Sequence, residues 1–435
     1  MTRTTHTPDD VGRHMAMSAI ANIAIPLASF ATAPILARVL GTEGRGELAA
    51  ITAPFLLVTT IAMLGLPEAV TYVVSRGDAS HGSGVARASL LLLASGVVST
   101  GVLILLAPWL SGGDPHIQQL MVLAALAVIP TLLVGALRGG ASGLQEWNRV
   151  NFEKYATALS RACAIFGFAI FGVLSVESAT LATIVAPILG VVAYFGLRAK
   201  ERTAEKRARF GSLLGFGGRV WLGSVSGILL NKLDQAIMVP LAGPVQLGIY
   251  AAASAVADAA LLANNAVRDV AFSTEAKEAA VERLTAAARR SFAVSLAVAV
   301  IICSTAWLWF PFLFGQDFAP GVPVVVVLTL ASALGVPGSI AGAGLSARGR
   351  PGIRSAALIV AAVANVILLL LLVPATGAMG AAWATLVGNV LAANINIIAC
   401  RRLYGIRVGR FYLIGLDDIR ALFALARRLI RRRAR

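Results

Sequence analysis

Four charged side chains fall within long apolar stretches of the sequence: Arg161, Lys232, Asp234 and Asp258. A charge near the middle of a bilayer is unfavourable by about 3 kcal/mol even on lenient insertion scales, so each needs a reason to be there. The planar fork of arginine suits phosphate, and acids within membranes commonly bind protons or other ions. These residues therefore predict anion binding and ion coupling inside a membrane.

The positions of these charges suggest roles and leave alternatives open. Arg161 lies about six residues inside the predicted span 155–175, where it either meets an anionic substrate or extends to the interface. Together with Lys232 and Arg38 it forms the predicted substrate-binding set. Asp258, with Asp234, is the predicted ion-coupling set, and a structural ion pair between Asp258 and Lys232 is the alternative. Lys232 and Asp234 are two residues apart on one helix and therefore cannot share a face.

The elements that carry these charges are membrane helices, because only 13% of the 435 residues are charged and 58% are hydrophobic. With a mean hydropathy of +0.81, this composition excludes a soluble enzyme, a disordered regulator and a disulfide scaffold. The three cysteines belong to no CxxC motif and no histidine cluster accompanies them, so no metal site and no cofactor is expected.

Twelve apolar stretches are long enough to cross the hydrocarbon core, which takes about 20 residues. We predict spans at 15–37, 48–66, 89–110, 120–137, 155–175, 180–197, 220–241, 247–267, 292–312, 322–345, 355–373 and 378–400. Of the 37 Lys and Arg residues, 33 lie in alternate connecting segments or the termini, and only Arg38 and Arg45 lie on the opposite side. This bias predicts a plasma-membrane protein with both termini in the cytoplasm.

The net charge of +16 is concentrated in those inner segments and the C-terminal tail, which argues against nucleic acid as a partner. Residues 416–430 repeat apolar side chains at helical spacing, and arginines follow. This pattern predicts an amphipathic tail lying on anionic lipid, with a disordered basic tail as the alternative.

Short similarities recur at an offset close to 202 residues along the chain. Gly46-Glu47-Leu48-Ala49-Ala50 corresponds to Gly248-Ile249-Tyr250-Ala251-Ala252, and Ala182-Thr183-Ile184-Val185 to Ala384-Thr385-Leu386-Val387. We therefore predict an all-α polytopic membrane protein of 12 transmembrane helices, built as two parallel six-helix repeats around a central cleft. The predicted domains are 1–210, 211–400 and a cytoplasmic tail, 401–435.

Several segments resemble a known family. The run Leu36-Ala37-Arg38-Val39-Leu40-Gly41-Thr42-Glu43-Gly44-Arg45-Gly46 looks like the signature after the first helix of polysaccharide flippases. Gly65-Leu66-Pro67-Glu68-Ala69 and Leu247-Gly248-Ile249-Tyr250 are similar to that family's later motifs. These flippases belong to the multidrug/oligosaccharidyl-lipid/polysaccharide exporter superfamily. The resemblance implies a transporter that flips a polyprenyl-pyrophosphate-linked glycan from the cytoplasmic to the outer leaflet, with a glycan polymerase or glycosyltransferases as partners.

Other functions remain as alternatives. A lipid II flippase is close to the leading hypothesis, and a multidrug or ion antiporter is less favoured because residues 15–37 contain no acid. A membrane enzyme is not expected, since all four histidines lie outside the spans and no P-loop motif occurs. A non-transporting scaffold for glycan assembly is the remaining class.

Overall fold

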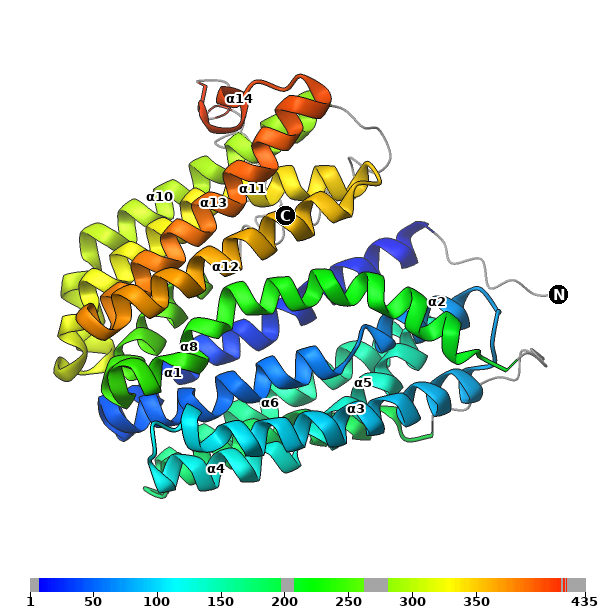
Figure 1. Cartoon of the computed structure of the whole chain (residues 1–435), viewed down its shortest axis with the longest axis horizontal. Coiled ribbons are helices and arrows are strands. Elements are labelled where there is room, and N and C mark those ends of the chain that lie inside the picture. The colour runs from blue at the N-terminus through cyan, green and yellow to red at the C-terminus, as the bar shows by residue number, and fades with distance from the viewer. Residues whose placement is uncertain (1–7, 197–206, 262–280, 416–417, 419, 421–435) are drawn as a thin grey trace, which may run out of the picture. The chain divides into compact units, whose positions relative to one another are not determined.

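The computed structural model describes residues 8–196, 207–261, 281–415, 418 and 420, and every regular element among them is a helix (Figure 1). The chain divides into two compact units, residues 1–252 and 253–435. The all-helical, multi-pass fold predicted from the sequence is confirmed over these residues.

The first unit contains the N-terminal helices, which pack side by side. Helix α1 packs against α6, and both α2 and α3 pack against α5. Its elements are α1 (Pro8–Ala62), α2 (Leu66–Ser75), α3 (His81–Leu110), α4 (Pro115–Leu126), α5 (Val128–Gly143), α6 (Trp147–Ile170), α7 (Val176–Leu189), the short helix η1 (Gly190–Tyr194) and most of α8 (Phe210–Ala260).

The second unit is a bundle in which α11 and α13 pack together and contact α10 and α12. Its elements are the end of α8, α10 (Val281–Phe314), η2 (Gln316–Gly321), α11 (Val322–Ala347), α12 (Pro351–Thr376), α13 (Ala378–Tyr404) and α14 (Gly409–Tyr412).

Two of these helices are bent at a single glycine. Gly41 interrupts α1 with φ 69° and ψ −174°, and Gly243 interrupts α8 with φ 81° and ψ 170°. Residues with a Cβ almost never adopt this region of backbone space, so glycine is required at both bends. The two bends are 202 residues apart, the same spacing as the sequence similarities.

Close packing joins the two bent helices within the first unit. The backbone of Gly46 on α1 lies against Pro244 and Gly248 on α8, and Gly248 lies in turn against Thr42 and Gly46. The contact is reciprocal, as expected where two equivalent segments meet across a twofold axis. Further along, the indole Nε1 of Trp221 donates to the carbonyl oxygen of Ile61 at 2.7 Å.

The bends account for how the predicted spans appear in the structure. Among the described residues, nine helical stretches are long and apolar enough to cross a membrane. The stretches Pro26–Ser75 and Phe210–Ala260 each cover two predicted spans, one on either side of a bend. Helix α6 overlaps the fifth predicted span but is not one of the nine long apolar stretches. The exact number of twelve stays a prediction.

A buried ion pair explains why α6 begins at Trp147, earlier than the apolar run suggests. Glu153 is buried and accepts two hydrogen bonds from the guanidinium of Arg138 on α5, both at 2.9 Å. The hydroxyl of Tyr194 lies 3.4 Å from the same carboxylate. These partners satisfy the charge of Glu153, so one side of the polar first turns of α6, with Val150, Asn151 and Glu153, packs inside the protein.

The segment after α13 folds back on the second unit. Ile406 and Phe411 are buried in a core cluster with Leu284, Leu345 and Ile397. The rest of the predicted amphipathic tail, with Leu416 and the arginines after Ala426, lies outside the described residues. Only its beginning is therefore placed, and it is packed against protein.

Candidate functional site

Arg161 lies on α6 in the first unit and is only partly satisfied. Its Nη1 donates to the hydroxyl oxygen of Ser29 on α1 at 3.2 Å. Its Nε is buried and has no hydrogen-bond partner among the described residues. A buried donor without an acceptor is unfavourable by about 1–3 kcal/mol, and more when the group is charged. The unsatisfied side of this guanidinium is suited to an oxyanion.

The depth of Arg161 follows from the early start of α6. Arg161 is fourteen residues beyond Trp147, which corresponds to about 21 Å along the helix axis at about 1.5 Å per residue. The start of α6 is therefore further from Arg161 than the apolar run alone suggested. Both interpretations of Arg161, contact with an anionic substrate and extension to the interface, stay predictions.

Arg45 is a second half-buried arginine and was not predicted as a site residue. It lies on α1, four residues after the bend at Gly41, and its Nε is also buried without a hydrogen-bond partner in the described part of the chain. The positive charge of Arg161 acts on it unfavourably. Two positively charged guanidinium groups inside the same unit, each lacking part of its hydrogen bonds, favour the binding of an anion between or beside them.

No local signal in the sequence pointed to Arg45. It stands between Gly44 and Gly46, both of which pack against neighbouring helices in the structure. Counting it as an outer-loop residue obscured this environment.

The other predicted cations lie elsewhere on the bent helices. Arg38 is exposed on α1, three residues before the bend at Gly41, and Lys232 is half-buried on α8. Arg45 and Arg161, which lie on α1 and α6 of the first unit, are two cations whose charges act on each other.

The two predicted ion-coupling acids have different environments. Asp234 is buried on α8, where its carboxylate accepts a hydrogen bond from the hydroxyl of Tyr250 and another, at 2.7 Å, from the backbone N–H of Gln235. Asp258 is exposed near the end of α8, in the portion that belongs to the second unit. Asp234 is thus held by its neighbours, whereas Asp258 is accessible.

The fold is that of solved membrane transporters. An inward-facing multidrug resistance MATE family transporter of the MOP superfamily matches with a TM-score of 0.69 and 16% identity, covering 88% of this chain and 97% of that chain. The lipid II flippase MurJ, in an inward closed conformation, matches with a TM-score of 0.66 and 14% identity, covering 95% and 92%. A MOP superfamily transporter from Pyrococcus furiosus, described as having a binding pocket of reversed polarity, gives 0.55 and 16%, covering 89% and 92%.

The sequence comparison reaches the family level. No protein of curated function matches the chain by sequence. The family described as "Polysaccharide biosynthesis protein" matches residues 11–272, which include nearly all of α1, all of α8, and both Arg45 and Arg161. The resemblance seen in the sequence is thus confirmed: the chain belongs to the polysaccharide biosynthesis protein family and has the fold of MOP superfamily transporters.

Proposed function

We propose that the protein is a secondary transporter that flips a polyprenyl-linked oligosaccharide from the cytoplasmic to the outer leaflet for cell-surface polysaccharide assembly. The observation that carries this proposal is the pair of half-buried arginines Arg45 and Arg161, whose Nε–H groups are buried and have no hydrogen-bond partner among the described residues. Membership of the polysaccharide biosynthesis family supports the glycan part of the substrate.

A pyrophosphate group fits the electrostatics of this pair. Two uncompensated cations in a low-dielectric interior raise the free energy of the empty protein, and an anion with several oxygens relieves both the repulsion and the unmade hydrogen bonds. Guanidinium groups bind phosphate oxygens in a bidentate manner, which adds geometric selectivity to the charge attraction. The linkage between the lipid and the sugar is therefore the part of the substrate that this site would hold.

The charges of Arg45 and Arg161 also distinguish between the alternative transport functions. A multidrug antiporter whose cargo is cationic is disfavoured, because Arg45 and Arg161 would repel a cation. A lipid II flippase would also carry a pyrophosphate-linked sugar, so the arginine pair supports it equally. The two flippase proposals differ in the glycan, which the arginine pair does not contact under this proposal.

The experiment that tests the proposal measures glycan display and ligand binding together. Arg45→Ala and Arg161→Ala should each abolish surface glycan at unchanged protein level and weaken binding of a polyprenyl pyrophosphate to the purified protein by about tenfold or more. Arg161→Lys keeps the charge but loses the fork, so we expect partial binding. Arg76→Ala is the matched control, since Arg76 contacts the ring of the exposed Tyr72. Normal display and normal binding in both alanine variants would refute the assignment.

Ion coupling through Asp258, with Asp234 in support, stays a prediction. Asp258→Asn should leave polyprenyl pyrophosphate binding intact but remove the response of transport to a proton or sodium gradient. A variant that responds to both gradients like the parent would make Asp258 a structural residue.

We also propose that the chain consists of two six-helix repeats, 1–210 and 211–400, and that both termini lie in the cytoplasm. The tail at 401–435 would lie on anionic lipid at the cytoplasmic surface. The repeat boundary is a property of the sequence, and the packing boundary after residue 252 arises because the first arm of α8 packs on the first unit. Glycosyltransferases or a glycan polymerase would supply or consume the lipid-linked glycan.

A further inference from the structure

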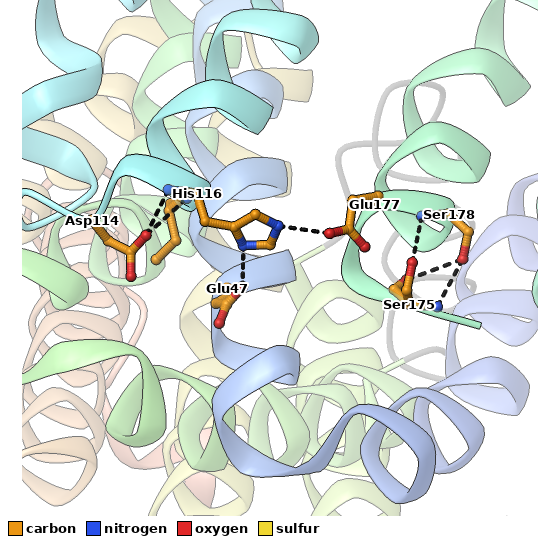
Figure 2. Close-up of polar contacts among 7 residues, drawn as sticks. Glu47, Asp114, His116, Ser175, Glu177 and Ser178 are labelled. Atoms are coloured by element: carbon orange, nitrogen blue, oxygen red, sulfur yellow. Dashed lines mark hydrogen bonds and ion pairs between the residues drawn. The ribbon is translucent and has the colours of Figure 1, made fainter. Parts of the chain in front are cut away.

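Three ionisable side chains from distant parts of the sequence meet in the first unit. The imidazole Nδ1 of His116 lies 3.0 Å from Glu47 Oε2, and its Nε2 lies 2.7 Å from Glu177 Oε1. Figure 2 shows the ring held between the two carboxylates, with one nitrogen toward each. We call these three residues the histidine cluster; they connect α1, the start of α4 and the start of α7.

Local structure fixes the backbone that carries each member of the histidine cluster. Asp114 caps α4 by accepting hydrogen bonds from the backbone N–H groups of His116 at 2.8 Å and Ile117 at 3.2 Å. A capping box formed by Ser175 and Ser178 begins α7 and holds Glu177 in the first turn (Figure 2). Since the caps set both helix starts, the ring and the carboxylates meet without disturbing the backbone.

The geometry determines how many protons the histidine cluster holds. A neutral imidazole has one N–H donor, and its other nitrogen is an acceptor. An ionised carboxylate is also only an acceptor, so a neutral ring with two carboxylates would leave one nitrogen lone pair facing an oxygen. Both contacts are satisfied only when one additional proton is present, either on the ring or on one carboxyl group.

We propose that Glu47, His116 and Glu177 form a proton-binding site, and that the bound proton ties the starts of α4 and α7 to α1. The orientation predicted from Lys and Arg places this site toward the outer aqueous phase, so the external pH would set its occupancy. The site is separate from the arginine pair and from Asp258, and it stands whether or not the substrate is a glycan.

Neighbouring charges favour the bound proton. Asp114 and Glu43 are further acids whose negative charge acts on Glu47. The N-terminus of α4 disfavours a positive charge at His116, which lies in its first turn, and the surrounding carboxylates oppose that effect. The histidine cluster thus concentrates negative charge around a ring that can carry one positive charge.

Unequal exposure indicates which contact opens when the proton leaves. The side chain of Glu177 is 51% exposed and that of Glu47 is 17% exposed. A carboxylate that turns into water recovers its hydration, and this is easier for Glu177. The neutral ring then keeps its hydrogen bond to Glu47, and the start of α7 is released from α4.

The test uses the full-length protein in lipid bilayers with ¹⁵N-labelled histidine, in which the ring nitrogens report protonation directly. The signal of His116 is identified by its loss in His116→Gln. We expect both ring nitrogens to carry protons at pH 6 and one to be lost at higher pH. In Glu47→Gln and in Glu177→Gln the midpoint should fall by about one pH unit, because each variant removes one adjacent negative charge.

A second measurement connects the proton to the helices. Hydrogen-exchange protection of residues 115–119 and 176–180 should fall about tenfold above the His116 midpoint, and His116→Gln should show the low protection at every pH. His81→Gln is the matched control and should keep the pH response, since His81 starts α3. A His116 midpoint that is unchanged in both glutamine variants, or protection that does not follow pH in the parent, would overturn the proposal. Loss of glycan display in the arginine variants bears on the substrate and leaves this result unaffected.

Discussion

Substituting Gly46 by alanine should destabilise the first unit, although alanine is normally the better helix former. A Cβ at Gly46 would lie 1.8 Å from the carbonyl oxygen of Pro244 and 2.6 Å from its carbonyl carbon. The reciprocal substitution at Gly248 would place a Cβ 1.8 Å from the carbonyl oxygen of Thr42. Both obstacles are backbone atoms, so no side-chain rotation relieves the contact.

The magnitude follows from how far the neighbouring helix must move. Real Cβ contacts stop near 3.0 Å, so the Pro244 carbonyl must retreat by about 1.2 Å. Overpacking of this kind destabilises by about 1–3 kcal/mol, occasionally more, and exceeds the gain of about 1 kcal/mol from replacing a helical glycine. The difference is a net loss of up to about 2 kcal/mol, and at about 2–4 °C per kcal/mol for a unit of this size a loss of about 2 kcal/mol lowers Tm by about 4–8 °C.

Thermal unfolding of the purified protein in nanodiscs, followed by tryptophan fluorescence, would measure the effect. Gly101→Ala on α3 and Gly167→Ala on α6 are matched controls, because an added Cβ meets nothing within 4 Å at either position. We expect the controls to raise Tm slightly and Gly46→Ala to lower it. Gly46→Ala and Gly248→Ala should be non-additive when combined, since they disrupt the same contact. If Gly46→Ala melts at or above the parent, the close approach of α1 and α8 is refuted.

Three further outcomes follow from other contacts. Tyr250→Phe removes the hydroxyl that donates to Asp234 and should lower thermal stability by about 1 kcal/mol, and an unchanged Tm would contradict this. Burial opposes ionisation of Asp418, but the hydrogen bond from Arg289 at 2.7 Å, the backbone N–H of Gly415 and the positive charges of Arg289 and Arg290 together outweigh it and hold the pKa of Asp418 below its usual range. The stabilisation from ionised Asp418 is therefore complete at neutral pH and is lost as pH falls below about 4. Hydrogen exchange of the segment before Asp418 should accelerate below that pH. In Asp418→Asn the same segment should exchange fast at neutral pH too. A synthetic peptide of residues 411–435 should be helical on anionic vesicles and coil on neutral ones, by circular dichroism; coil on both would contradict the predicted amphipathic tail.

Hydropathy predicted the helical, membrane-spanning fold well because lipid-facing apolar runs are a local property of the sequence. The same measure did not indicate that α6 begins before the apolar run, since it scores Glu153 as polar without knowing that Arg138 satisfies it inside the protein. It did predict separate spans on either side of the polar segment 38–47, and Gly41 interrupts α1 within that segment.

The site was predictable only where the signal was local. Arg161 stood out because a charge interrupted an apolar run. Arg45 did not, since its burial depends on α1 packing against other helices. The histidine cluster joins residues 69 and 61 positions apart, and each member alone is an ordinary polar residue near a helix end. Such convergence depends on tertiary structure, which no spacing rule within one helix can supply.

The bend at Gly41 also bears on how the chain enters its membrane. The two arms of α1 are joined by one non-helical residue, so we expect them to insert together as a helical hairpin. The tip of that hairpin carries Arg38 and Arg45 together with Glu43 and Glu47, which sum to no net charge. A membrane potential does work of about 2.3 kcal/mol per elementary charge for each 100 mV, and on a neutral tip that work cancels. With the cytoplasmic N-terminus that the Lys and Arg bias predicts, we expect insertion of the first hairpin to be insensitive to the potential, and removing either glutamate alone should make the potential favour holding the tip on the cytoplasmic side.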